Sequence, residues 1–168
     1  MSRAFVKEPD GNQVDDELPE RPRSPHPNYV TPAGLRQLHA RIKKLAEERA
    51  RLQSAGERLA EKNQLRLVER DLRHVEQGLK RAILVDPAAQ PRSDIRFGAE
   101  VEVLDEQGER HRFRIVGEDE ACAPKGYISW VSPLARALLG KRVGDVVNWE
   151  HPAGNVELEV VEVDYPPT

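Results

Sequence analysis

The sequence feature that most constrains the fold is a pair of apolar seams at helical spacing with one glycine between them. Thr31-Pro32 can start a helix, because the Thr hydroxyl can cap an unpaired amide and Pro suits the first helical position. Gly56 separates the seams, so residues 31–86 are predicted to form an antiparallel coiled-coil hairpin. The alternative is one continuous helix in a parallel dimer. Gly56 disfavours it, and so does the change in phase of the apolar spacing in the middle of the segment. The seams are Leu35, Leu38, Ile42, Leu45 and Leu52, then Leu65, Val68, Leu72, Val75, Leu79 and Ala82.

After Asp86-Pro87 the apolar period changes from helical to alternating. Residues 100–103, 112–115 and 156–160 alternate apolar with polar side chains, which is typical of half-buried strands. Ser132-Pro133 can begin a short helix that Gly140 ends. Residues 87–168 are therefore predicted to form an antiparallel sheet of four or five strands with one short helix, which gives the chain an α+β fold.

Residues 1–30 contain five prolines and the acidic run Asp15-Asp16-Glu17, with almost no periodic apolar residues. This composition predicts a mostly disordered N-terminal extension. The stretch from Ser24 to Tyr29 is expected to be stiffer and able to pack locally.

Composition indicates that part of the chain is elongated or disordered. Charged residues make up 33% of the chain, against about 25% in a typical globular protein, and aromatic residues only 5%. Residues 31–86 hold 13 Lys and Arg against 8 Asp and Glu, a net charge of +5, whereas residues 87–168 hold 9 against 15, a net charge of −6. The two halves are expected to present fields of opposite sign to a partner, and neither is basic enough for a self-sufficient DNA-binding domain.

Several classes of protein are disfavoured by what the sequence contains. Cys122 is the single cysteine, so no internal disulfide is expected, and no Cys or His cluster has zinc-site spacing. The first 30 residues carry charges where a secretory signal needs an apolar run, and no stretch is long enough to span a bilayer. We expect a cytoplasmic protein with no membrane partner, no metal ligands and no catalytic residues, that is, not an enzyme.

A series of motifs resembles the bacterial Gre transcript-cleavage factors, in particular the GreB branch. The resemblance covers roughly residues 29–165. Its most specific part lies in the C-terminal half, and residues 29–35 and 83–86 resemble the family's opening and close of the hairpin. The C-terminal motifs are residues 111–120, 127–129, 132–141 and 143–145.

The resemblance implies an FKBP-like C-terminal domain that docks on the rim of the secondary channel of RNA polymerase, while the hairpin reaches down that channel. Nucleic acid would be contacted only within the elongation complex. The implied polymerase-binding residues are Ser129, Trp130, Ser132, Pro133 and Leu134, with Trp130 and Leu134 as candidate apolar anchors or, alternatively, core residues. The family usually has Asp or Asn where this chain has Val131. This replacement would weaken the polar contacts with the polymerase.

In active members of the family, a closely spaced Asp and Glu at the hairpin tip hold a second Mg²⁺ of the polymerase active site. Here the segment is about a dozen residues shorter, or about six residues in each helix, which at 1.5 Å per residue shortens the arm by roughly 9 Å. Glu57 and Glu61 are the remaining tip carboxylates, and near Arg58 and Lys62 they are expected to be solvated.

The resemblance therefore implies an elongation regulator with weak or no stimulation of transcript cleavage and no cofactor of its own, any Mg²⁺ being shared with the polymerase. One alternative is a cleavage-stimulating cofactor that uses Glu57 and Glu61. Another is a short-armed polymerase regulator similar to the regulator of nucleoside diphosphate kinase.

Overall fold

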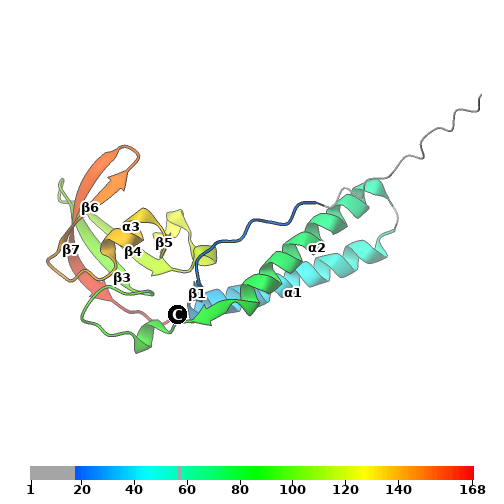
Figure 1. Ribbon diagram of the computed structural model, residues 1–168, viewed down its shortest axis with the longest axis horizontal. Coiled ribbons are helices and arrows are strands. Elements are labelled where there is room, and N and C mark those ends of the chain that lie inside the picture. Colours follow the sequence, from blue (N-terminus) through cyan, green and yellow to red (C-terminus); the bar gives the residue numbers. More distant parts are fainter. Residues whose placement is uncertain (1–17, 57) are drawn as a thin grey trace, which may run out of the picture.

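Two long helices fold back on each other and form the arm of the molecule (Figure 1). The computed structural model describes residues 18–56 and 58–168. Helix α1 spans Pro32–Ser54 and helix α2 spans Leu59–Lys80. Five of the predicted seam residues are buried along the facing sides of the helices: Leu38, Leu52, Val68, Leu72 and Val75. The antiparallel hairpin is thus confirmed, and the single continuous helix is not formed.

A pair of short strands closes the base of the arm. Strand β1 (Asn28–Val30) precedes α1, strand β2 (Ala82–Leu84) follows α2, and the two pair in parallel. Val30 is 1% exposed and packs with Leu38 and Val75 in a small core at the foot of the hairpin. This two-stranded sheet was not predicted, because three-residue strands carry too short a pattern to be recognised.

A five-stranded sheet forms most of the C-terminal domain. Its strands are β3 (Glu100–Asp105), β4 (Arg110–Val116), β5 (Tyr127–Ser129), β6 (Val146–His151) and β7 (Gly154–Asp164), in the spatial order β5-β4-β3-β7-β6. All neighbours are antiparallel except β4 and β5, which are parallel. The prediction of a wholly antiparallel sheet was therefore wrong at this edge. The chain between β4 and β5 makes two 3-10 turns, Glu118–Glu120 and Ala123–Lys125, and these return it so that β5 runs in the direction of β4.

One helix and the chain ends of the domain cover the inner face of the sheet. Helix α3 (Pro133–Leu138) contributes Leu134, Ala135 and Leu138 to the core, where they meet the inward side chains of the strands. The predicted alternation along the strands is confirmed, since Val101 and Val103 on β3 are both 0% exposed. Tyr165 closes the core: its hydroxyl donates to the Asp94 carbonyl at 2.6 Å and accepts from the Arg96 amide at 3.0 Å.

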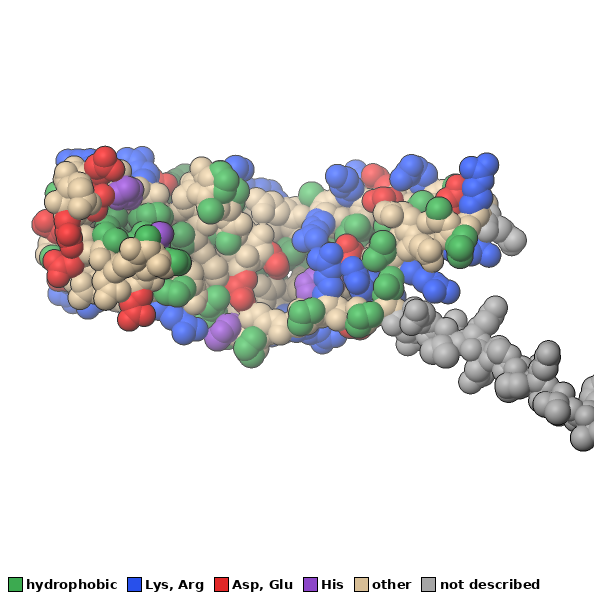
Figure 2. Space-filling view, turned by 90° about the horizontal axis from the view of Figure 1, so that it is seen from above, with side chains coloured by type: hydrophobic (Ala, Val, Ile, Leu, Met, Phe, Trp, Pro, Cys, Tyr) green, Lys and Arg blue, Asp and Glu red, His purple; other side chains and the backbone are tan. Residues whose placement is uncertain are grey.

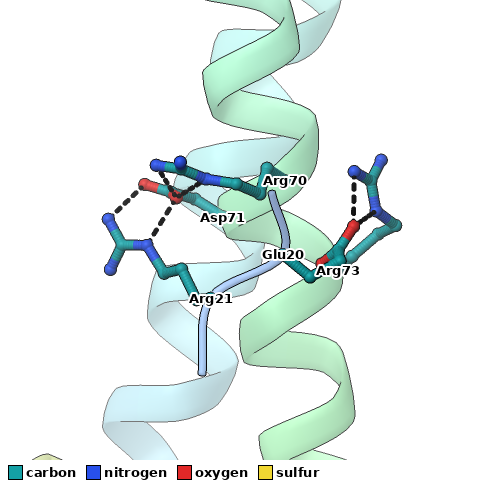
Figure 3. A network of polar contacts seen from close by, with 5 residues as sticks. All are labelled: Glu20, Arg21, Arg70, Asp71 and Arg73. Atoms are coloured by element: carbon teal, nitrogen blue, oxygen red, sulfur yellow. Dashed lines mark hydrogen bonds and ion pairs between the residues drawn. The ribbon is translucent and has the colours of Figure 1, made fainter. Parts of the chain in front are cut away.

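The chain before β1 runs along α2 in the direction of the hairpin tip (Figure 1). We call residues 18–29, which end within β1, the strap. Two residues of the strap form ion pairs with α2, Glu20 with Arg73 and Arg21 with Asp71 (Figure 3). The expectation of a disordered extension was therefore wrong for residues 18–23, where these ion pairs hold the chain. The expectation that the stretch from Ser24 to Tyr29 packs locally is confirmed, since His26 and Tyr29 contact Trp130. Residues 1–17, including the acidic run at residues 15–17, lie outside the described residues.

Candidate functional site

The tip of the hairpin is a short turn. Helix α1 ends at Ser54, Gly56 adopts a left-handed backbone with φ of +109°, and α2 begins at Leu59. A positive φ is readily adopted by glycine, so Gly56 makes the reversal possible. Of the two predicted tip carboxylates, Glu57 lies outside the described residues. Glu61 lies in the first turn of α2, where the helix dipole favours a negative charge.

Within the described residues, Glu61 is the tip carboxylate whose surroundings can be followed. Glu61 is half-buried, and its Oε2 atom is shielded from solvent with no hydrogen-bond partner among the described residues. Arg58 and Lys62 flank it in the sequence. Mg²⁺ in proteins is usually bound by one or two carboxylates together with substrate phosphates and waters. The described part of the tip offers one such carboxylate, with two cations beside it in the sequence, and Glu57 lies outside the described residues.

The segment predicted to dock is built around the start of α3. The Ser132 hydroxyl accepts a hydrogen bond from the Ala135 amide at 3.3 Å, which caps α3, and Pro133 occupies the first position of the helix. The Ser129 hydroxyl accepts from the Val131 amide at 3.3 Å. Pro133 is exposed, and the two serines are half-buried. These three predicted residues lie together on one corner of the domain.

Leu134 does not belong to that surface. Its side chain is 4% exposed and packs in the core of the C-terminal domain. The prediction that Leu134 is an apolar anchor for a partner was therefore wrong, and the alternative that it is a core residue is the one found. The apolar stripe of α3 faces the sheet, because the sheet has no other helix to cover its inner face.

Trp130 is covered by the strap. The ring of Tyr29 meets the indole edge-on, with centroids 5.0 Å apart, and the ring of His26 does the same at 5.9 Å. The indole is half-buried, and its Nε1 has no hydrogen-bond partner within the described part of the chain. The second predicted anchor is thus a contact between the C-terminal domain and the N-terminal segment of the same chain.

A buried carboxylate joins the hairpin to the C-terminal domain, and sequence reasoning did not find it. Glu120 is 8% exposed and accepts hydrogen bonds from the Thr31 amide at 3.0 Å, from the Thr31 hydroxyl and from the Gly117 amide at 3.2 Å. Thr31 in turn accepts from the Gly34 amide at 3.1 Å. The negative charge lies at the N-terminus of α1, where the helix dipole stabilises it. Glu120 thereby fixes the point from which the arm leaves the domain.

The outer end of the β3–β4 hairpin holds a polar cluster. The carboxylates of Asp105 and Glu109 and the imidazole of His111 lie within 4.8 Å of one another. His111 Nε2 is 2.7 Å from Asp105 Oδ2, and the amides of Gln107 and Glu109 donate to Asp105 Oδ1. The hydrogen bond from His111, with those from the backbone, lowers the pKa of Asp105 below its ordinary value of 3.8. The carboxylate of Asp105 is thus engaged in holding the turn.

The predicted separation of charge is visible on the surface. Figure 2 shows Lys and Arg side chains gathered along the hairpin, and acidic side chains at the end of the C-terminal domain away from it. Within the residues that the structure describes, no helix is long and apolar enough to cross a membrane. A long basic arm on a small acidic domain is therefore the architecture that any function must use.

Comparisons with known proteins identify the family. A sequence model described as "Transcription elongation factor, GreA/GreB, C-term" matches residues 90–165. The transcription elongation factor GreB of Neisseria meningitidis serogroup B is 34% identical over 153 residues, which cover 82% of this chain and 94% of the relative. The chain belongs to the GreA/GreB family of transcription elongation factors. The GreA of Alkalilimnicola ehrlichii is 41% identical over 122 residues, covering 71% of this chain and 77% of that protein.

The part of the chain that matches the GreA/GreB C-terminal model contains the five-stranded sheet and α3. The hairpin and the strap lie before it. Among solved structures, the GreA/GreB elongation factor of Nitrosomonas europaea is 25% identical, and the comparison covers 82% of this chain and 98% of that one with a TM-score of 0.41. The family model and the GreB and GreA relatives confirm the resemblance to the Gre family that was drawn from the sequence motifs.

Proposed function

We propose that this chain binds bacterial RNA polymerase at the rim of the secondary channel and regulates elongation there. The observation that carries the proposal is the alignment with a GreB elongation factor over 94% of its length, which includes the hairpin as well as the C-terminal domain. The acidic domain is the anchor and the basic hairpin is directed into the channel. We place the protein in the cytoplasm, where it meets nucleic acid only within the elongation complex.

The docking surface that we propose is the exposed corner at the start of α3. It consists of Ser129, Ser132 and Pro133, together with Arg136 one turn further along the same helix, which is exposed. Leu134 is omitted because it lies in the core, and Trp130 because the strap covers it. Val131 is half-buried at the same corner, and it cannot offer the polar contact that Asp or Asn would make.

We further propose that the chain has no catalytic chemistry and no cofactor of its own, and that it stimulates transcript cleavage weakly or not at all. The support is the composition of the tip, where Glu61 is flanked by Arg58 and Lys62. The hairpin helices have 23 and 22 residues, and 23 residues give an arm of about 34 Å. In this proposal the hairpin acts by occupying the channel, and any Mg²⁺ belongs to the polymerase active site.

Binding is tested by titrating the full chain into labelled core RNA polymerase. Arg136→Glu should weaken binding by roughly tenfold, because it reverses a charge at the proposed contact. Arg92→Glu makes the same charge change at an exposed position outside the corner and serves as the control. No binding of the unmodified chain would refute the proposal, and equal losses in the two variants would refute the location of the contact.

Cleavage is tested on backtracked elongation complexes with 3′-extended RNA. We expect RNA to be cleaved no faster with the chain than with polymerase alone, while a GreB relative accelerates the reaction in parallel. Acceleration that Glu61→Gln removes would instead support the alternative in which Glu57 and Glu61 hold an ion.

A further inference from the structure

The strap contacts both parts of the molecule. Toward the hairpin, Glu20 Oε1 lies 2.8 Å from Arg73 Nη2 and 2.9 Å from Arg73 Nε. Arg21 meets Asp71 with two guanidinium nitrogens, Nε at 2.9 Å and Nη2 at 3.1 Å (Figure 3). This bidentate geometry is the most directional form of an Arg–carboxylate pair. Arg70 shares the Asp71 carboxylate at 3.4 Å, so Arg21, Asp71 and Arg70 form one cluster, and the Glu20–Arg73 pair lies beside it.

Nearer the base, the strap is held through its backbone and through Asn28. The Arg81 guanidinium donates to the carbonyls of Ser24 and His26, at 3.4 and 3.2 Å. Asn28 Nδ2 donates to the carbonyl of Gly78 at 2.8 Å. Together with the ion pairs at Asp71 and Arg73, these bonds join the strap to α2 and its C-cap Arg81 over nearly three turns of helix. The strap therefore follows the helix surface and does not cross it at one point.

Toward the C-terminal domain, the strap is held by aromatic rings. Tyr29 and His26 meet Trp130 as described above, and the ring of Tyr29 also lies 5.9 Å from that of Phe97. Edge-to-face pairs of this kind stabilise beyond the apolar area that they bury. One continuous segment thus links a site about halfway along α2 to a site on the sheet domain.

The arm acts mechanically as a lever. An arm of about 34 Å that tilts by roughly 10° at its base moves its tip by about 6 Å. The Glu120–Thr31 contact lies at the pivot, so it resists such a tilt with little leverage. The ion pairs at Asp71 and Arg73 lie about 10–14 Å up the helix from Lys80, where a contact resists tilting more effectively.

We propose that the strap fixes the direction of the hairpin relative to the C-terminal domain, so that Glu20, Arg21, His26 and Tyr29 are positioning residues for the tip. The consequence for polymerase rests on the function proposed above, whereas the fixed direction is a property of the free protein. A chain with a loosened strap still docks through its C-terminal domain, but its tip no longer reaches one place.

The experiment measures the distance between the arm and the domain in the free, full-length protein. Spin labels at Arg66→Cys on α2 and Arg136→Cys on α3, both exposed, are introduced in a Cys122→Ser background. Pulsed electron paramagnetic resonance then gives the distribution of distances between them. With the strap intact we expect one narrow distribution.

The loosened variant is Glu20→Arg with Arg21→Glu, which keeps the composition but places like charges opposite Arg73 and Asp71. We expect the width of the distance distribution to increase about twofold, because like charges in contact repel. Adding Asp71→Arg and Arg73→Glu restores both pairs with reversed polarity and should narrow the distribution again. Tyr29→Ala should widen it independently, through loss of the contact with Trp130.

Circular dichroism confirms in each case that the helices are intact, and the charge-exchanged variants keep the proposal testable if Tyr29→Ala does not fold. The proposed role of the strap would be contradicted if the distance distribution stayed narrow in the loosened variant. It would also be contradicted if the compensating exchange did not restore the narrow distribution. This measurement involves no polymerase, so the two proposals are tested separately. The strap proposal can be wrong while polymerase binding is observed, and it can be right while polymerase binding is absent.

Discussion

At the scale of single residues, the carboxylate of Glu120 determines how closely the hairpin approaches the domain. A Cβ atom at Gly34 would lie 2.2 Å from Glu120 Cδ, and one at Gly117 would lie 2.3 Å from the Tyr29 carbonyl oxygen. The glycines are therefore required by space and not by backbone conformation. The Thr31-Pro32 signal predicted the helix start correctly, but nothing in the local pattern indicated that residue 120 would complete the cap.

Gly34→Ala tests this crowding. The added methyl group should displace Glu120 from its hydrogen bonds with Thr31 and lower the free energy of unfolding by about 1–3 kcal/mol. Gly78→Ala is the control, since its Cβ would meet nothing closer than 3.9 Å, and the higher helix propensity of Ala should stabilise α2 by up to about 1 kcal/mol. Chemical denaturation of both variants measures the difference, and equal stabilities would show that the junction is not crowded.

Asp105 gives a prediction about pH. Because its pKa is lowered in the folded state, chiefly by the hydrogen bond from His111, it contributes stability at pH values above 3.8 that is lost as the pH falls through the lowered value. Asp105→Asn should therefore flatten the acid limb of the plot of unfolding free energy against pH. Glu106→Gln removes an exposed neighbouring carboxyl and is the control. Parallel curves for Asp105→Asn and the unmodified chain would contradict this role.

At the scale of elements, helix α3 illustrates the limit of periodicity as evidence. The spacing of its apolar residues predicted the helix and its capped start, both of which the structure contains. The same stripe can face a core or a partner, and the pattern alone did not decide between them for Leu134. The hairpin seams were predictable because their partner is the adjacent helix. The strap contacts join residues about 50 positions apart, and no repeating pattern marks them.

Leu134→Ala should lower the free energy of unfolding of the C-terminal domain by about 2–5 kcal/mol, because it leaves a cavity in the core. The control is Val143→Ala, at a side chain that is 60% exposed, where the change should stay within about 0.5 kcal/mol. Urea denaturation followed by tryptophan fluorescence measures both, since Trp149 packs against the core. If the Leu134→Ala domain were stable but failed to bind polymerase, Leu134 would have to be assigned to the docking surface after all.

At the scale of the whole molecule, the sheet domain holds a complete core. Every buried residue of that core lies between Ile95 and Tyr165, so its packing needs nothing from the hairpin. Residues 87–168 alone should therefore fold, with a cooperative thermal transition by circular dichroism. In a competition titration they should keep most of the affinity of the full chain for polymerase. An affinity loss of more than about 100-fold, roughly 2.7 kcal/mol, would instead show that the hairpin contributes a large part of the binding free energy.

The parallel pair β1–β2 brings the beginning and the end of the arm side by side, about 5 Å apart. The 51 residues from Thr31 to Arg81 therefore form an insertion. Its first and last residues are fixed at the base, whereas the hairpin tip is free. The length of the insertion can change without disturbing the base or the strap, provided that both helices gain or lose equal numbers of residues in whole heptads on the tip side of Asp71. Seven residues added to each helix would extend the arm by about 10 Å. Reach in this architecture is thus an independent variable that evolution or a protein engineer can alter in steps.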